Sequence, residues 1–285
     1  MNIVLADPTG FCFGVKRAIT ELEKALSVHG TIYSTGSPIH NPQEVRRLSK
    51  KGLVVVDDVS KIPDGARVFI RAHGESPDVL AGINQKSSTV IDGTCPFVKT
   101  AQNKARSLSS EGYFVIIIGN PEHPEVKGIR GFVNGDSIVV NDRSVIPEKM
   151  PSEKTGVVCQ TTQRYELLAD ITSWIVYKCK ELKVYNTICN ATYERQKAIR
   201  ELAKVVDGII VIGGRNSANT SKLFQIARAE SLAAVWIEEA AELQEEWLVT
   251  KENIGIAAGA STPDWLIEEL KYKLKNTGSQ RGWKR

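Results

Sequence analysis

Residues 10–19 read GFCFGVKRAI, a cysteine followed by a helix-like run, and this arrangement returns twice further along the chain. The second copy is GTCPFVKTAQ at residues 93–102, and the third is TICNATYERQ at residues 187–196. The cysteines at the mouths of these three expected helices are Cys12, Cys95 and Cys189. Self-similarity of this kind predicts a fold assembled from copies of one structural unit.

A fixed spacing extends the repeat beyond the cysteines. The same step along the chain leads from each cysteine to a polar loop, at His40, His123 and Ser217. A second polar position follows a later strand-like run, at a separation that grows slightly from copy to copy, at His73, Thr161 and Ser261. The simplest geometry for three such copies is a pseudo-threefold ring whose centre receives three thiolates and six polar loops.

The composition is that of an ordinary globular protein. Hydrophobic residues make up 42% and charged residues 25% of the 285 positions, which excludes the disordered and collagen-like classes. The formal net charge of +4 is too small to indicate a nucleic-acid partner. The N-terminal MNIVLADPTGFC lacks the basic and apolar regions of a signal peptide, and no run approaches the roughly 18 apolar residues of a membrane helix. We therefore expect a cytoplasmic protein that contacts neither a membrane nor a nucleic acid.

Short apolar runs alternate with amphipathic stretches along the chain. Such alternation predicts an α/β fold with parallel sheets, in which ligands bind at the loops that follow the strands. The expected strands are residues 3–6, 68–71, 89–91, 113–118, 156–159, 208–212, 234–237 and 254–257. The expected helices include residues 15–26, 98–108, 165–182, 193–205 and 221–229.

The cysteines favour a metal site over disulfide bonds. The odd count of five argues against a disulfide framework, and the absence of any Cys-x-x-Cys pair argues against a zinc ribbon. Helix N-termini favour the thiolate, so Cys12, Cys95 and Cys189 suit a soft metal or an iron–sulfur cluster. Three cysteines on a cluster leave one iron open to a substrate, whereas a three-cysteine zinc site remains an alternative. Cys159 and Cys179 are expected to be small buried side chains, with Cys179 on the predicted helix 165–182.

The other side chains of the repeated loops suit a phosphate or diphosphate. Ser217, Asn219 and Ser261 add hydrogen-bond donors to those of His40 and His73. The helices expected behind the serine loops would add backbone N–H groups and partial positive charge. The sequence therefore predicts an anion pocket in the loops that surround the cysteines.

Two further polar residues lie in the same loops, and the sequence allows a catalytic or a purely structural role for each of them. Glu125 follows His123 by two residues; it could deliver a proton to a substrate, or only favour the start of a helix. Thr161 could position a substrate hydroxyl, or cap the helix that is expected near residue 165. The residues by themselves leave both alternatives open.

Taken together, the motifs resemble the 4-hydroxy-3-methylbut-2-enyl diphosphate reductase family, which catalyses the last step of the non-mevalonate isoprenoid pathway. The matching blocks run in the family's order from residue 3 to about residue 265, and as a set they are highly specific. They read ADPTGFCFGVKRAI, IHNPQEV, RAHG, DGTCP, NPEHPEVKG, QTTQ, ICNATYERQ, NSANTSKL and AGASTPDW.

The resemblance implies a trefoil-like, pseudo-threefold arrangement of three small α/β domains around a central iron–sulfur cluster. The implied domains are residues 13–96, residues 97–189, and residues 190–285 together with the N-terminal strand 1–12. The implied ligands of one 4Fe–4S cluster, whose fourth iron stays open to the substrate, are Cys12, Cys95 and Cys189.

The resemblance also assigns roles to the polar loops. The residues implied near the reacting hydroxyl are His123, Thr161 and Glu125, with Glu125 delivering the proton. The residues implied for diphosphate binding are His40, His73, Ser217, Ala218, Asn219 and Ser261. Many family members have a serine where this chain has Ala218, so at that position only the backbone N–H remains to donate.

The implied reaction is the reductive removal of the allylic hydroxyl from (E)-4-hydroxy-3-methylbut-2-enyl diphosphate. Two electrons and two protons then yield isopentenyl and dimethylallyl diphosphate plus water. The implied electron donor is a ferredoxin or a flavodoxin, and a monomer or homodimer is expected. The residues alone leave three alternatives: a non-redox iron–sulfur hydro-lyase, a zinc hydrolase of a phosphorylated substrate, and a cluster-containing sensor that binds diphosphates.

Overall fold

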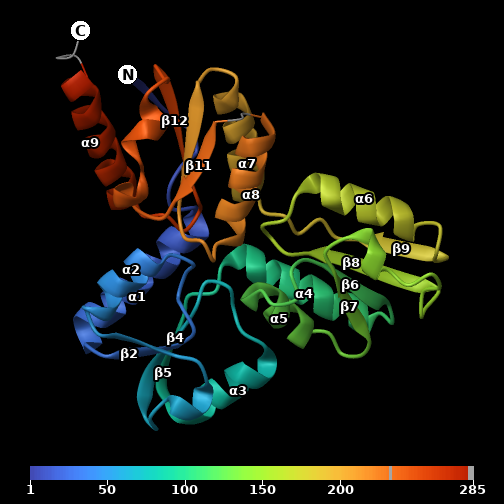
Figure 1. Ribbon diagram of the computed structural model, residues 1–285. Coiled ribbons are helices and arrows are strands. Elements are labelled where there is room, and N and C mark those ends of the chain that lie inside the picture. The colour runs from blue at the N-terminus through green and yellow to red at the C-terminus, as the bar shows by residue number, and fades with distance from the viewer. Residues whose placement is uncertain (231–232, 282–285) are drawn as a thin grey trace. The chain divides into compact units, whose positions relative to one another are not determined.

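The structure is a computed structural model that describes residues 1–230 and 233–281. The strands within these residues form three sheets of four parallel strands each (Figure 1). By its internal contacts the chain divides into two compact units. The first unit holds residues 1–13, residues 40–44 and the chain from residue 190 onward, and the second unit holds residues 14–39 and 45–189.

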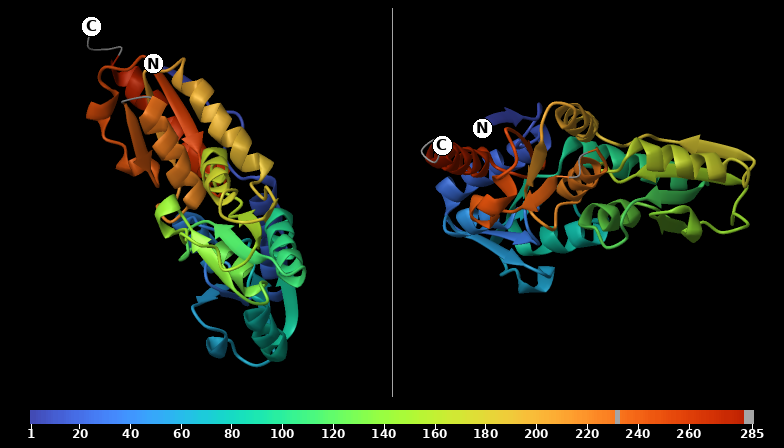
Figure 2. Two further views of the ribbon diagram at one scale, coloured as in Figure 1. Left: turned by 90° about the vertical axis from the view of Figure 1, so that its right-hand side faces the viewer. Right: turned by 45° about the horizontal axis from the view of Figure 1, so that its top comes forward.

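The first unit contains one sheet with helices on both faces (Figure 2). Its strands lie in the order β1 (Asn2–Leu5), β12 (Asn253–Ala258), β10 (Gly208–Ile212) and β11 (Ala234–Ile237). Successive side chains of a strand point to opposite faces, so Ile210 and Ile212 pack against α9 (Asp264–Arg281). Ile209 and Val211 pack on the other side against α7 (Asn190–Ala203) and α8 (Ala218–Glu230). Burial on both faces explains why such strands read as continuous apolar runs.

The second unit contains the other two sheets. One has the strand order β3 (Leu53–Val56), β2 (Ile32–Thr35), β4 (Ala66–Ile70) and β5 (Ser87–Asp92), with the helices α1 (Phe13–His29) and α3 (Pro77–Lys86). Helix α2 (Pro42–Ser49) begins in the first unit and belongs to the second from residue 45. The other sheet has the order β7 (Ser137–Val140), β6 (Phe114–Ile118), β8 (Lys154–Cys159) and β9 (Glu181–Val184), and its helices are α4 (Pro96–Ser110), α5 (Pro124–Gly131) and α6 (Tyr165–Ile175). Short 3₁₀ helices precede β4, β8 and β12, at Val59–Lys61, Arg143–Val145, Ala240–Glu242 and Glu245–Leu248.

All three sheets follow the same chain order, which confirms the predicted α/β class and the predicted repeat. In each sheet the strand that leads to a cysteine (β1, β5 or β9) is an edge strand. That strand pairs with the one that leads to the second polar loop of another copy (β12, β4 or β8), and the strand that leads to the first polar loop of that same copy (β10, β2 or β6) comes next. Each sheet thus combines the two polar loops of one copy with the cysteine that begins the following copy. Because every pair is parallel, the cysteine loop and the two polar loops of each sheet leave it at one carboxyl edge, where ligands bind in open α/β sheets.

Helix α6 is shorter than the sequence predicts. The expected helix 165–182 ends at Ile175, and residues 181–184 form β9 instead. The reason is tertiary: the backbone N–H groups of Lys180 and Glu181 both donate to the carbonyl of Glu153, which aligns this segment with β8. Cys179 therefore lies in the turn between α6 and β9 and not on a helix.

Four strands were absent from the predicted set: β2, β3, β7 and β9. Each is only four residues long, and β3, β7 and β9 are edge strands. An edge strand has a neighbouring strand on one side only and is less fully buried. Its apolar and polar residues therefore need not alternate, and the sequence shows no clear strand pattern.

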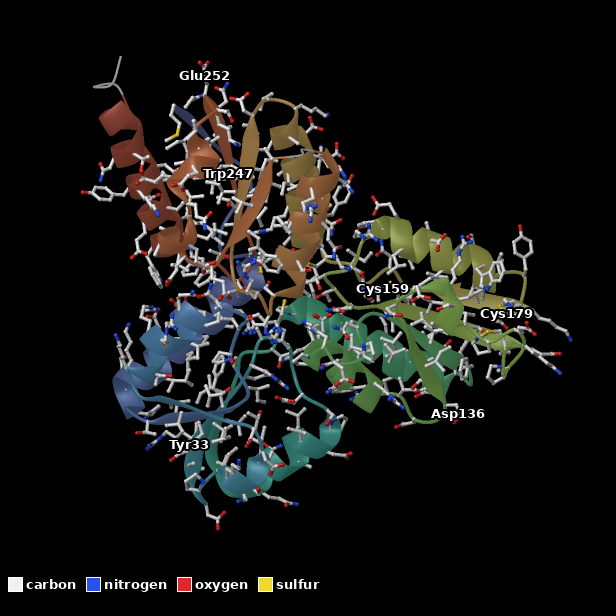
Figure 3. The ribbon with its side chains drawn as sticks, in the orientation of Figure 1. Tyr33, Asp136, Cys159, Cys179, Trp247 and Glu252 are labelled. Carbon is white, nitrogen blue, oxygen red and sulfur yellow. The ribbon has the colours of Figure 1, made fainter. Side chains whose placement is uncertain are left out.

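The two cysteines that were expected to be structural lie in the core around β8 (Figure 3). Cys159 is fully buried at the end of β8, and burial raises the pKa of its thiol to about 12. Cys179 is half-buried against the same cluster. Among the helices of the described chain, none combines the length and the apolar character that a membrane span requires.

Candidate active site

The three repeated cysteines occupy equivalent places at helix starts. Cys95 is the N-cap residue of α4, and Cys12 and Cys189 directly precede α1 and α7. All three are half-buried and form no disulfide bond within the described residues. The partial positive charge of a helix N-terminus stabilises a thiolate, which is the form that binds metals.

Each cysteine is also held by the same backbone hydrogen bond within its own unit. The N–H of Cys12 donates to the Ala260 carbonyl at 3.1 Å. The N–H of Cys95 donates to the Ala72 carbonyl and that of Cys189 to the Thr161 carbonyl, both at 3.0 Å. The three accepting carbonyls lie in the loops after β12, β4 and β8, so the repeat in the sequence is a repeat in backbone geometry.

The Cys95 thiol lies directly against Gly14, which has no side chain to occupy that space. A Cβ atom at Gly14 would lie 2.5 Å from Cys95 Sγ and 3.3 Å from its Cβ, so only glycine fits beside this cysteine. Glycine is unfavourable inside a helix, and its presence in the first turn of α1 is explained by this close approach.

Glu125 and Thr161 form a buried pair in the second unit. Oε1 of Glu125 accepts from the Thr161 N–H at 2.5 Å, and Oε2 accepts from the Thr161 hydroxyl at 2.9 Å. Burial raises the pKa of Glu125 to about 7, against the two hydrogen bonds from Thr161, which lower it. The carboxyl group can therefore hold a proton near neutral pH and release it.

The position of Thr161 excludes one of the two roles predicted from the sequence, that of a helix cap. Helix α6 begins at Tyr165 with Arg164 as its N-cap residue, so Thr161 does not cap it. Instead its side chain contacts Glu125 while its carbonyl accepts from Cys189. Thr161 thus contacts both the Glu125 carboxyl, whose pKa is raised, and the backbone of Cys189.

Two histidines meet beside this pair. His123 is the N-cap residue of α5, and its Nδ1 accepts from the Glu125 N–H at 3.2 Å. This bond fixes the neutral tautomer with the proton on Nε2, which can then donate to a ligand. The rings of His73 and His123 are in edge contact, with centroids 5.5 Å apart.

The first unit collects the serine and asparagine donors. Ser217 is positioned as the N-terminal cap of α8, since its Oγ accepts from the Thr220 N–H at 3.2 Å. The Ser261 hydroxyl donates to the His40 carbonyl at 3.0 Å and lies 3.5 Å from Ser217 Oγ. Ala218 is the first residue of α8, where a backbone N–H has no acceptor within the helix.

Asn219 differs from these residues because its side-chain amide makes no hydrogen bond to the described residues. It is 4% exposed, and neither Oδ1 nor Nδ2 has a hydrogen-bond partner among the residues that the structure describes. A buried amide without partners is costly, so its position is explained if a ligand supplies them. The donors around it suit an anion at the start of α8.

The structure therefore gathers the expected site residues in two sets. The first unit holds Cys12, His40, Ser217, Ala218, Asn219 and Ser261. The second unit holds Cys95, Cys189, His73, His123, Glu125 and Thr161. Sequence reasoning missed Gly14 and Arg17, although both lie in the quoted stretch at residues 10–19, where a glycine inside a helix is a signal of close approach.

The donor set fits a thiolate-bound metal centre. The three cysteines share one local geometry, at helix starts and with backbones held by the same hydrogen bond. Soft thiolate ligands of this kind select iron–sulfur clusters or zinc over magnesium and calcium.

Comparison with known proteins gives one consistent result. A family model described as LytB protein matches residues 3–275. A curated protein of Aquifex aeolicus (strain VF5) is 43% identical over 279 residues, covering 96% of each chain, and one of Campylobacter hominis is 44% identical over 275 residues, covering 96% of this chain and 98% of its own. Both are named 4-hydroxy-3-methylbut-2-enyl diphosphate reductase.

Solved structures agree with these relatives. One, described as (E)-4-hydroxy-3-methyl-but-2-enyl diphosphate reductase, the terminal enzyme of the non-mevalonate pathway, has 42% identity and a TM-score of 0.73, and the match covers 97% of this chain and 100% of that one. Another, described as the E-1-hydroxy-2-methyl-but-2-enyl-4-diphosphate reductase from Plasmodium falciparum, has 28% identity and a TM-score of 0.88, over 96% of this chain and 87% of its own.

Proposed function

The chain belongs to the LytB protein family, and we propose that it reduces (E)-4-hydroxy-3-methylbut-2-enyl diphosphate to isopentenyl and dimethylallyl diphosphate. The observation that carries this proposal is the identity of 43% and 44%, over 96% of the chain, to two proteins named as this reductase. The reaction consumes two electrons and two protons and releases the allylic hydroxyl as water. This chain's own loops offer the groups that such a reaction needs.

For the cofactor, we propose one 4Fe–4S cluster bound by Cys12, Cys95 and Cys189. The equivalent helix-start positions of the three thiols support this assignment. When bound, such a cluster supplies electrons one at a time and, with only three protein ligands, a Lewis-acidic iron for the substrate oxygen. The domain boundaries after residues 12, 96 and 189 belong to the same proposal, since each range then contains one cysteine-led copy.

Proton delivery is assigned to Glu125 and Thr161. With a pKa of about 7, the Glu125 carboxyl holds a proton in a good share of molecules at neutral pH. The Thr161 hydroxyl can accept that proton from Oε2 and donate its own proton toward a leaving oxygen. The proton is then passed along a hydrogen bond and is never released into the buried site as a free ion. His123, with its proton on Nε2, would donate a hydrogen bond to the substrate.

Binding of the diphosphate is assigned to His40, His73, Ser217, Asn219 and Ser261, with the backbone N–H of Ala218. The buried, unpartnered amide of Asn219 supports this role. Hydroxyl and amide donors at the start of α8 would hold the diphosphate and thereby fix the position of the hydroxyl at the other end of the substrate.

For the electron source, we propose a small one-electron carrier of the ferredoxin or flavodoxin type. The reaction needs two electrons, and the proposed cluster can pass on only electrons that a donor has given to it. A cytoplasmic location is part of the same proposal, because reduced thiols at the three positions require a reducing compartment.

The function is tested by anaerobic purification, counting iron and sulfide, and assaying the substrate with a low-potential reductant. We expect a brown protein that consumes the substrate and forms both five-carbon diphosphates. A colourless zinc protein that ignores the substrate would contradict the proposal. Turnover without electron demand would favour a hydro-lyase, and diphosphate binding without turnover would favour a sensor.

Gly14→Ala is predicted to impair the cysteine site without unfolding the chain. The added methyl group would meet Cys95 Sγ at 2.5 Å, so the thiol must move away from its place. Ala stabilises a helix relative to Gly by about 1 kcal/mol, so α1 itself should tolerate the change. Iron content per chain is the measurement, with Gly82→Ala for comparison, since Gly82 lies inside α3 and a Cβ there would come no closer than 3.3 Å to any atom. Full iron in the Gly14 variant would show that Cys95 does not need this position.

Asn219→Ala is predicted to weaken substrate binding. Loss of a hydrogen bond to a charged group costs about 1.5 to 3 kcal/mol, which corresponds to roughly a 10- to 100-fold rise in KM. Steady-state kinetics should show a much smaller change in kcat, because the diphosphate is remote from the bond that breaks. Asn216→Ala in the same loop is the matched control, since Asn216 is exposed. An unchanged KM would remove Asn219 from the binding site.

A further inference from the structure

Two arginines hold the loops that carry two of the repeated cysteines. In the second unit, Nη2 of Arg17 donates to the carbonyl of Thr94, the residue before Cys95, at 2.6 Å. In the first unit, Nη2 of Arg195 donates to the carbonyl of Gly10, two residues before Cys12, at 2.7 Å. Both arginines come from a helix that itself begins next to a cysteine, α1 for Arg17 and α7 for Arg195.

The placement of Arg17 on α1 ties it to the Cys95 thiol. Gly14 and Arg17 are three residues apart in this helix, so they lie on the same face. Gly14 lies against Cys95 Sγ, and Arg17 holds the carbonyl of the preceding residue. One face of α1 therefore fixes both the side chain of Cys95 and the backbone that leads into it.

Both guanidinium groups are withdrawn from water. Arg195 is 4% exposed, and its Nη1 also donates to the Ala191 carbonyl at 3.1 Å. Arg17 is half-buried, and its Nε–H is buried with no hydrogen-bond acceptor in the described part of the chain. Burying a cation costs free energy that nearby negative charge offsets, so two such cations beside cysteine loops point to the negative charge that the cysteines carry when a metal centre is bound.

The loop of the third cysteine is held by a threonine side chain. Thr187, two residues before Cys189, accepts from the Cys159 N–H at 2.8 Å and donates to the Cys159 carbonyl at 2.6 Å. The loop of Cys189 is thus tied to the end of β8 by a neutral side chain. Each of the three cysteine loops is therefore held by a hydrogen-bonding side chain within its unit, and for Cys95 and Cys12 that side chain is an arginine.

We propose that Arg17 and Arg195 are positioning residues that hold Cys95 and Cys12 in metal-binding geometry and place positive charge beside the bound cluster. The inference rests on the proposed cluster. Outer groups that orient metal ligands typically change metal affinity by about 10- to 100-fold when they are removed. Positive charge and hydrogen bonds near an iron–sulfur cluster also favour its reduced state and raise its reduction potential.

The test compares Arg17→Met with wild type and with Lys16→Met. Methionine keeps an apolar stem but cannot donate to Thr94, whereas Lys16 is an exposed neighbour on α1 whose replacement removes one charge. After anaerobic purification, loss of the visible absorption in the presence of an iron chelator and the reduction potential are measured. We expect Arg17→Met to lose its cluster about 10-fold faster or more and to have a lower potential. Lys16→Met should match wild type, and Arg17→Lys should recover the potential because the charge is kept.

The outcomes separate this inference from the proposed function. Equal rates and equal potentials in Arg17→Met and wild type would overturn the positioning role while leaving the function intact. A wild-type protein that binds no cluster would overturn both. The melting temperature of the metal-free protein, expected to be similar in all variants, distinguishes cluster loss from unfolding. If Arg17→Met does not fold, Arg195→Met provides the same comparison at Cys12.

Discussion

Cys95→Ser is expected to lose the iron–sulfur centre and at least about 1000-fold of turnover, equivalent to roughly 4 kcal/mol of transition-state stabilisation. Serine is nearly isosteric, and the N–H of residue 95 can still donate to the Ala72 carbonyl, so the loop should keep its shape. What disappears is the soft thiolate, and a serine hydroxyl does not ionise to replace it near neutral pH. Iron and sulfide counts, the visible spectrum and the turnover number measure the effect.

Cys179→Ser is the matched control for this variant. Cys179 is a free, half-buried cysteine of the same unit, but it packs on the core around β8 and follows the end of α6. It should retain the full iron content and activity. A Cys95→Ser protein with as much iron as Cys179→Ser would show that the ligand assignment is wrong, and Cys12→Ser and Cys189→Ser extend the same comparison to the other two copies.

Glu125→Gln is expected to keep the cluster and lower kcat by about 100-fold or more, because general acid catalysis by a positioned side chain typically contributes 10²- to 10⁴-fold. Glutamine has nearly the same shape and can still accept one hydrogen bond from Thr161, so the loop should be preserved. It cannot donate a proton. Turnover measured beside iron content distinguishes loss of the proton donor from loss of the cluster.

The pH dependence of kcat gives a sharper test of Glu125. Burial raises the pKa of this carboxyl to about 7. A proton donor is active in its protonated form, so kcat in wild type should fall as the pH rises through about 7. In Glu125→Gln this fall should be absent, since the titrating group is gone.

Glu122→Gln serves as the control for Glu125→Gln. Glu122 lies three residues earlier in the same loop, and its exposed side chain pairs with Lys127 at 2.8 Å. Its replacement should leave kcat and the pH profile as in wild type. Near-normal turnover in Glu125→Gln, or an unchanged fall near pH 7, would remove Glu125 from the mechanism.

Much of the fold was predictable because each copy of the repeat shows its helices, strands and loops as short, local sequence patterns. The three cysteine-led blocks, the polar loops that follow them at equal spacing and the apolar strands such as residues 114–118 and 208–212 all carry strong signals. The α/β class with parallel sheets followed from their alternation and is confirmed. The roles of the twelve expected site residues stay predictions that the variants above test.

The errors concern features that depend on contacts far along the chain. The end of α6 is set by the carbonyl of Glu153, which draws residues 180 and 181 into line with β8. The edge strands β3, β7 and β9 exist because a neighbouring strand supplies their hydrogen bonds, and their own residues alternate too little to reveal them.

The sequence by itself determined the α/β class, the threefold repetition, the cysteines that start helices and the family to which the chain belongs. Only the tertiary structure decided that Thr161 contacts Glu125 and does not cap α6, that burial brings the pKa of Glu125 to about 7, and that Gly14 and Arg17 lie against the Cys95 loop. The physical reason is that a sequence pattern reflects the local conformational preference of the backbone and shows which face of a helix or strand is apolar. Desolvation, close approach and the choice of hydrogen-bond partner depend on residues tens of positions away, which meet only in the folded chain.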